Sequence, residues 1–177
     1  MVLQFVIVVG LWVSLYTLND WMFDHWSFSA HVSWIFLPAA LRMIAVLLLG
    51  WVGAAGIFFG SLMTCFFVAE LTDISHMLII SGLSALAPTL ALLLCAHFFG
   101  VNADLAGLSA RKLLLLSVLA ASFTAGLHNI HFSAVGYVDA IGDSILAMFV
   151  GDLFGTLVVL YAAKWLVTLL VPKSASF

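Results

Sequence analysis

The chain has 177 residues, of which 66% are hydrophobic and only 7% charged. Soluble domains average about 25% charged residues, so the composition excludes a water-soluble globular protein. Five Lys and Arg residues stand against eight Asp and Glu residues, with no basic cluster, which excludes a nucleic-acid partner. Cys65 and Cys95 both lie in apolar runs, so neither a disulfide framework nor a zinc cluster is expected.

Six apolar segments along the chain are candidates for membrane helices, which need about 20 residues each. The first has neither the basic start nor the cleavage site of a signal peptide, so we interpret it as a retained helix. A tight turn at Gly50 joins the second and third segments, and a polar loop separates the fourth from the fifth. The predicted spans are residues 2–18, 33–49, 51–69, 77–99, 113–131 and 142–171.

The positive charges of the loops predict the orientation in the membrane. Arg111, Lys112 and Lys173 fall on one side, which the positive-inside rule makes cytoplasmic. Acidic residues without Lys or Arg fall on the other side. We therefore predict an all-α polytopic bundle that forms one domain over residues 1–177, with both termini in the cytoplasm. Short loops and the retained first helix indicate a bacterial cytoplasmic membrane.

Two charged residues lie deep inside predicted spans, where a charge costs about 2.5–3.5 kcal/mol and usually finds a partner within the bundle. Arg42 is in the second span and Asp152 in the sixth. At about 1.5 Å per residue, each reaches a depth of roughly 12 Å from the outer face. Equal depth predicts a salt bridge with bidentate geometry. The pair either only holds two helices together or also contacts a ligand and relays a conformational change.

Small residues predict where the helices pack closely. Gly53, Gly56 and Gly60 share one face of the third span, and Gly151 and Gly155 form a GxxxG motif around Asp152. Such faces let helix backbones approach each other in membranes. We expect packing within the chain, with a docking face for a partner helix as the alternative.

Two prolines interrupt predicted spans, Pro38 in the second and Pro88 in the fourth. Each removes a backbone donor, so a kink is expected at both. Pro38 precedes Arg42 by one turn, and a kink there would open a cavity on the outer half of the bundle. Trp34 and the outer-face histidines are expected to line this cavity together with Arg42 and Asp152.

Five of the six histidines are predicted to lie near the outer face: His25, His31, His76, His128 and His131. His128 and His131 are spaced i,i+3 and are the weak candidates for a metal site or a pH sensor. Because no compact ligand motif accompanies them, we expect neither a metal nor a cofactor. No nucleophile motif such as GxSxG is present, so we expect no enzymatic activity.

Two stretches carry a resemblance to a known family. Residues 31–62, HVSWIFLPAALRMIAVLLLGWVGAAGIFFGSL, combine a Trp, a Pro-Ala pair, a Gly-Trp turn and a Gly-rich helix. Residues 149–161, FVGDLFGTLVVLY, contain a Gly-Asp-x-x-Gly helix. In this order they resemble the membrane-associated sensor (MASE-type) domains of bacterial histidine kinases and diguanylate cyclases, in a shortened, stand-alone form. The resemblance implies a sensory role.

A second resemblance rests on size and topology. Six helices, cytoplasmic termini, short loops and small-residue faces are similar to the substrate-binding components of energy-coupling factor vitamin transporters. Together, these features predict an integral membrane sensor-like or accessory protein. It would bind a small molecule or a partner helix in an outward-facing cavity and contact a membrane-protein partner or a second copy. A solute-binding transporter component and a structural subunit of a membrane complex are the alternatives.

Overall fold

The computed structural model describes residues 1–23, 27–29, 32–100 and 109–170. Within these residues the chain forms six helices and one short antiparallel hairpin. The elements are α1 (Val2–Phe23), β1 (Ser27–Ser29), β2 (Val32–Ser33), α2 (Pro38–Leu49), α3 (Trp51–Phe67), α4 (Ile74–Phe99), α5 (Ala110–Ala134) and α6 (Ile141–Leu170).

Four helices, α1, α4, α5 and α6, are long and apolar enough to cross a membrane. The other two are shorter, with 12 residues in α2 and 17 in α3. At 1.5 Å rise per residue they extend over about 18 and 26 Å, whereas a bilayer core is about 30 Å thick. The helical fold class is therefore confirmed, and within the described residues four of the six predicted spans have helices of sufficient length.

The start of the predicted second span is wrong. Instead of a helix from residue 33, β2 ends at Ser33 and α2 begins only at Pro38. A proline is tolerated in the first turn of a helix because the N–H it lacks would have no partner there. The kink predicted at Pro38 is therefore replaced by a helix start, whereas Pro88 does lie inside α4.

Polar caps start α4 and α5 earlier than their apolar runs predict. The Asp73 carboxylate accepts hydrogen bonds from the backbone N–H groups of Ser75 and His76 at the start of α4. The Ser109 hydroxyl accepts one from Lys112 N–H at the start of α5. These bonds satisfy N–H groups that have no partner within the helix.

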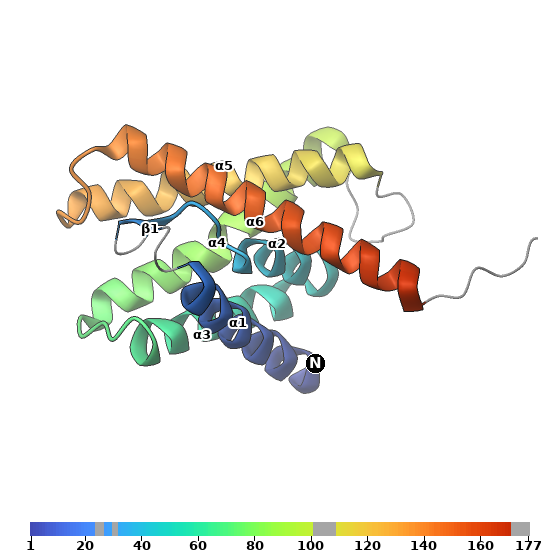
Figure 1. Ribbon diagram of the computed structural model, residues 1–177, viewed down its shortest axis with the longest axis horizontal. Coiled ribbons are helices and arrows are strands. Elements are labelled where there is room, and N and C mark those ends of the chain that lie inside the picture. The colour runs from blue at the N-terminus through green and yellow to red at the C-terminus, as the bar shows by residue number, and fades with distance from the viewer. Residues whose placement is uncertain (24–26, 30–31, 101–108, 171–177) are drawn as a thin grey trace, which may run out of the picture.

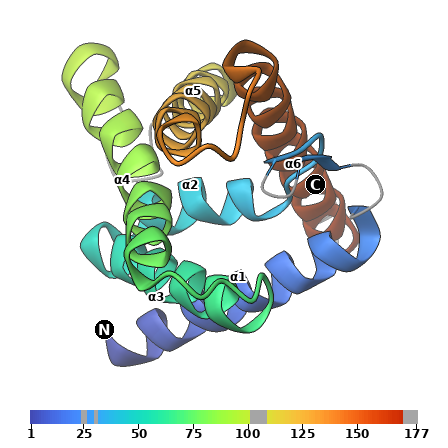
Figure 2. The same cartoon turned by 90° about the vertical axis from the view of Figure 1, so that its left-hand side faces the viewer.

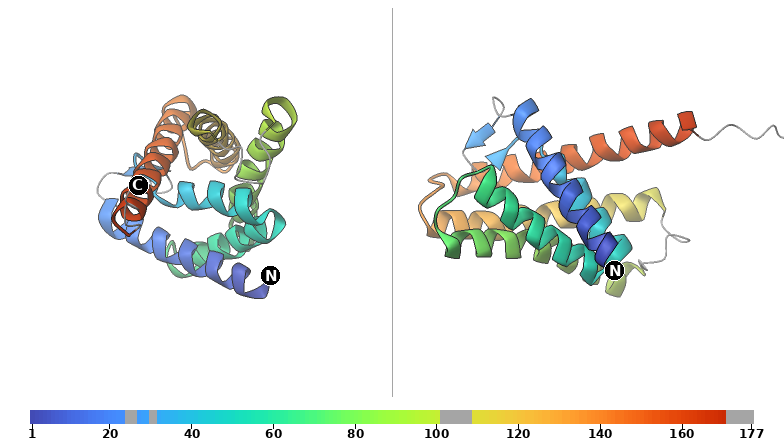
Figure 3. Two further views of the ribbon diagram at one scale, coloured as in Figure 1. Left: turned by 90° about the vertical axis from the view of Figure 1, so that its right-hand side faces the viewer. Right: turned by 90° about the horizontal axis from the view of Figure 1, so that it is seen from below.

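The short helix α2 lies at the centre of the fold and contacts each of the other five helices. Viewed along the long axis, α1, α3, α4, α5 and α6 surround it (Figure 2). Neighbours around this ring are α1 and α3, α3 and α4, α4 and α5, and α5 and α6, while the β1–β2 hairpin packs on α6. Helix α1 runs obliquely across α3 (Figure 3). A residue on α2 can therefore meet side chains from the whole bundle.

One end of the molecule, which we call the hairpin end, gathers three of the connections. The β1–β2 hairpin, the α3–α4 loop and the α5–α6 loop all lie there (Figure 1). Helix α6 ends toward the opposite side, and the α2–α3 turn at Gly50 lies away from the hairpin end as well. The hairpin end is the one that the positive-inside rule predicts to face outward.

Glycines in α3 allow α1 and α2 to approach closely. A Cβ atom at Gly53 would collide with the backbone of Ala45 in α2. A Cβ atom at Gly56 would lie 2.6 Å from Val8, and one at Gly60 2.8 Å from Trp12, both in α1. These three glycines therefore lie at helix–helix contacts within the chain.

The glycines of α6 also lie at contacts within the chain, but the segment that they contact is not helical. A Cβ atom at Gly151 would collide with the carbonyl oxygen of Ser33, and one at Gly155 with that of Phe36. The partner is thus the non-helical segment from Ser33, the last residue of β2, to the start of α2. The Phe36 N–H also donates to the Gly151 carbonyl at 3.0 Å, so the GxxxG motif seats an irregular backbone directly on α6.

Candidate functional site

The two buried charges meet in the interior. Arg42 lies in the second turn of α2 and Asp152 midway along α6, and their side chains are only 5% and 4% exposed. A single nitrogen, Nη2 of Arg42, donates to both carboxylate oxygens of Asp152 at 2.7 Å. The geometry is therefore bidentate at the carboxylate but not the two-nitrogen fork of an ideal Arg–carboxylate pair. Nη1 and Nε bond none of the described residues.

Aromatic rings surround the guanidinium of Arg42. Its central carbon lies 5.1 Å from the ring centroid of Phe36 and 6.0 Å from that of Trp12. Edge-to-face contacts join the Phe36 ring to those of Trp12 and Tyr16. A cation over an aromatic face gains electrostatic stabilisation, most of all where water is excluded. The rings therefore contribute to keeping Arg42 charged in the interior.

An amide from α1 holds the irregular segment, the residues that connect β2 to α2, in place. The Asn19 side-chain oxygen accepts a hydrogen bond from the Leu37 N–H at 2.8 Å, and Asn19 is buried. Leu37 directly precedes the first residue of α2, so its N–H has no partner within the helix. In a membrane such a donor must be satisfied by the protein itself.

We expect Asn19→Leu to destabilise the protein by about 1–3 kcal/mol, because it leaves the buried Leu37 N–H without its acceptor. Thermal unfolding in detergent measures the loss. Thr17→Val on the same helix is the control, since within the described part of the chain its exposed hydroxyl bonds only the Val13 carbonyl. Its effect should stay within about 0.5 kcal/mol. Equal stability of Asn19→Leu and Thr17→Val would contradict this role.

A chain of polar side chains lies across from the ion pair and joins α3, α4 and α5. The Ser61 hydroxyl is 3.5 Å from that of Ser84, which is 3.3 Å from Nε2 of His128. The other ring nitrogen, Nδ1, is 3.0 Å from the Thr124 carbonyl oxygen. A carbonyl only accepts, so neutral His128 carries its proton on Nδ1, and Nε2 accepts from Ser84. Ser84 in turn accepts from Ser61, which fixes the direction of the whole chain.

Thr64 extends this chain of polar side chains toward α1, and we call Ser61, Thr64, Ser84 and His128 together the polar wall. Its hydroxyl accepts from the Trp12 indole N–H at 3.2 Å and donates to the Ser61 carbonyl at 3.0 Å. The hydroxyl hydrogens of Ser61, Thr64 and Ser84 are thus all engaged within the protein. The polar wall therefore presents hydrogen-bond acceptor oxygens to the space in front of it.

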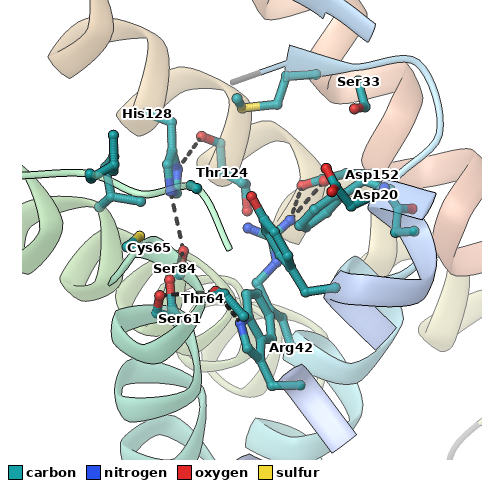
Figure 4. A pocket seen from close by; sticks show the side chains of 18 of the residues that line it. Asp20, Ser33, Arg42, Ser61, Thr64, Cys65, Ser84, Thr124, His128 and Asp152 are labelled. Atoms are coloured by element: carbon teal, nitrogen blue, oxygen red, sulfur yellow. Dashed lines mark hydrogen bonds and ion pairs between the residues drawn. The ribbon is translucent and has the colours of Figure 1, made fainter. Parts of the chain in front are cut away.

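Between the ion pair and the polar wall lies a cavity of about 240 Å³ (Figure 4). Figure 4 shows Arg42 and Asp152 on one side of it and Ser61, Ser84 and His128 on the other. Lining residues come from all six helices. Toward the hairpin end they include Asp20, Ser33 and two residues of the α3–α4 connection, Ala69 and Leu71.

The other residues predicted for the cavity are placed elsewhere. Trp34 is 39% exposed and makes an edge-to-face contact with Phe28, outside the cavity lining. Pro38 is buried in the first turn of α2 and does not line the cavity either. His25 and His31 lie outside the described residues. Of the outer-face histidines in the described part of the chain, His128 alone lines the cavity.

His128 and His131 do not converge on a common point. His131 instead pairs with His76 of α4, with Nε2 and Nδ1 2.8 Å apart and the two rings stacked at 4.8 Å between centroids. His128 directs its ring nitrogens to Ser84 and Thr124. Among the described residues, no group of three or more His, Cys, Asp or Glu side chains could hold a metal ion.

The sequence reasoning missed the polar wall. Ser61 and Thr64 are spaced i,i+3, and Thr124 and His128 i,i+4, so each pair lies on one face of its helix. Hydroxyl residues on one face of an otherwise apolar helix are a signal that could have been noticed. Asn19 gave a weaker signal, because it lies at the predicted end of the first span, where an exposed amide is ordinary.

The fold and the cavity together define a class: a helical bundle with four helices long and apolar enough to cross a membrane, and with a cavity beside a buried ion pair. No protein-family model, no curated protein and no solved structure matches this chain.

Proposed function

We propose that the protein is a multi-pass protein of a bacterial cytoplasmic membrane that binds a small molecule in this cavity, as a sensor-like or accessory component. One observation carries the proposal: all six helices line a 240 Å³ space that holds a buried ion pair. Ligand sites are concave and mostly apolar, with a few polar groups that fix orientation. A molecule seated here touches every helix, so its binding would favour one arrangement of the bundle over another.

Access from outside the cell follows from the charge distribution. The cavity reaches the hairpin end, where Asp20, Asp73 and Asp139 are found, whereas Arg111 and Lys112 start α5 at the other end. The positive-inside rule places the basic end in the cytoplasm. The site would thus sample small molecules from the outer side of the membrane.

A sensor needs a recipient for its signal. We propose a membrane-protein partner or a second copy of the chain, contacted through helices within the bilayer. The last turns of α6 suit this role, because Tyr161, Trp165 and Leu166 are all strongly exposed. The resemblance of residues 31–62 and 149–161 to MASE-type sensor domains supports the same role, since these two segments contribute Arg42 and Asp152.

A solute-binding component of a transporter is the second candidate. The observation that favours it is that residues of all six helices line the cavity, so a movement of any one helix would change the contacts of a bound solute. A structural subunit would have no need of such a cavity.

Filling the cavity tests the proposal. We expect native mass spectrometry of gently purified protein to show a retained small molecule, which Ser61→Phe should abolish because the ring occupies the space. Ser122→Phe is the matched control, since this exposed serine of α5 bonds only the Val118 carbonyl among the described residues. Circular dichroism verifies that both variants keep their helix content. Wild-type protein without a retained molecule, or equal retention in Ser61→Phe, would refute small-molecule binding.

A further inference from the structure

The cavity contains charges of both signs that already neutralise each other. Arg42 and Asp152 are both buried, and they are joined at 2.7 Å. A bound anion would compete with Asp152 for the guanidinium, and a bound cation would compete with Arg42 for the carboxylate. Either would leave a buried charge less well compensated, which is strongly unfavourable. The exposed Asp20 at the edge of the cavity adds one further negative charge against an anion.

The hydrogen-bonding groups of the two sides are complementary. On one side, Arg42 lines the cavity, and its Nη1 and Nε donors bond no described residue. On the other side, the Ser61, Thr64 and Ser84 hydroxyls already donate within the protein and present acceptor oxygens. A fitting molecule therefore places an acceptor near Arg42 and a donor toward Ser61 and Ser84.

Aromatic and aliphatic side chains form much of the remaining lining. Trp12, Tyr16, Phe36 and Phe132 line the cavity, together with Ile80 and Met148. Rings of this kind favour a flat apolar body that packs edge to face or in an offset stack. A volume of about 240 Å³ limits the ligand to a small molecule of one or two rings.

We infer that the ligand of this cavity is a small, uncharged, ring-containing molecule with both an acceptor and a donor, as in a primary amide or lactam. The inference rests on the proposed function and narrows it to one chemical class. It rules out carboxylates, phosphates and amines as preferred ligands, although Arg42 by itself would suggest an anion.

Three probes of nearly equal shape separate the possibilities. Benzoate is anionic and only accepts, benzamidine is cationic and only donates, and benzamide is neutral and does both. We measure binding by isothermal titration in detergent, with Ser61→Phe as the blank for partitioning into the micelle. Benzamide should bind at least tenfold more tightly than either charged probe. Ser61→Ala, which removes an acceptor, should weaken benzamide binding about tenfold, whereas Ser122→Ala should leave benzamide binding unchanged.

Each other outcome overturns the inference. Tighter binding of benzoate would show that the guanidinium is available to anions, and tighter binding of benzamidine that a carboxylate is available to cations; both would leave the cavity as a ligand site. An equal affinity of Ser61→Ala and wild type would refute the assigned orientation. If no probe binds, the chemical class is wrong, because all three are smaller than the cavity. The mass spectrum of the wild-type protein then decides separately whether any small molecule is bound.

Discussion

Arg42→Ala alone is expected to destabilise the protein by about 3–5 kcal/mol, because it leaves the Asp152 carboxylate buried without its counter-charge. Asp152→Ala should cost a similar amount for the same reason. The double variant should be more stable than either single variant, since it removes both charges. Thermal unfolding of the four proteins in one detergent measures this coupling as a double-mutant cycle.

The control is Asp20→Ala, which removes an exposed carboxylate near the same cavity and should change stability by no more than about 0.5 kcal/mol. A double variant clearly less stable than both single variants would contradict the coupling. That result would mean that each side chain is needed for contacts of its own, such as the packing of Arg42 against Phe36.

A hydrophobic replacement separates a purely structural ion pair from a ligand site. Arg42→Met with Asp152→Leu keeps much of the volume and buries no charge, so it should fold about as stably as wild type. If the pair serves only to join α2 and α6, this variant loses nothing else. If Arg42 provides a donor to a bound molecule, the variant loses the molecule retained by wild-type protein while it keeps its stability.

Much of this arrangement could be predicted from the sequence, because lipid restricts what a chain can do. A charge inside an apolar helix must find a partner, so Arg42 and Asp152 could be matched by depth alone. Glycines at helical spacing indicate close approach, and each of the five predicted positions does lie against another segment. The long apolar runs correctly predicted the positions of α4, α5 and α6, with errors of a few residues at the helix ends.

The second predicted span could not be predicted correctly, for a physical reason. Residues 33–37 are as apolar as a helix, and nothing in their composition shows that they form an irregular segment. Backbone N–H groups of this segment donate hydrogen bonds to Asn19 of α1 and Gly151 of α6, which are both remote in the sequence. Only the position of Pro38 was a local signal, and a proline is compatible with both a kink and a helix start.

Gly155→Ala is expected to destabilise the protein by at least about 1–3 kcal/mol, the usual cost of inserting an extra carbon into a filled interior. The new Cβ atom would collide with the Phe36 carbonyl, a backbone atom that no rotamer change can move. Gly126→Ala in α5 is the matched control, because its added Cβ would meet no other segment of the described chain within 4 Å. There the better helix propensity of alanine should leave stability unchanged or raise it by up to about 1 kcal/mol.

The same substitution should also affect the site, which makes it more informative than a stability measurement alone. The backbone that Gly155 supports runs directly into α2, whose second turn carries Arg42. Pushing this segment away from α6 lengthens the distance that the guanidinium must span to Asp152. Gly155→Ala should therefore lose both stability and the retained molecule, whereas Gly126→Ala should keep both. If Gly155→Ala and Gly126→Ala unfold at the same temperature, the irregular segment does not pack on α6. In that case, its contact with α6 does not position Arg42 for its ion pair with Asp152.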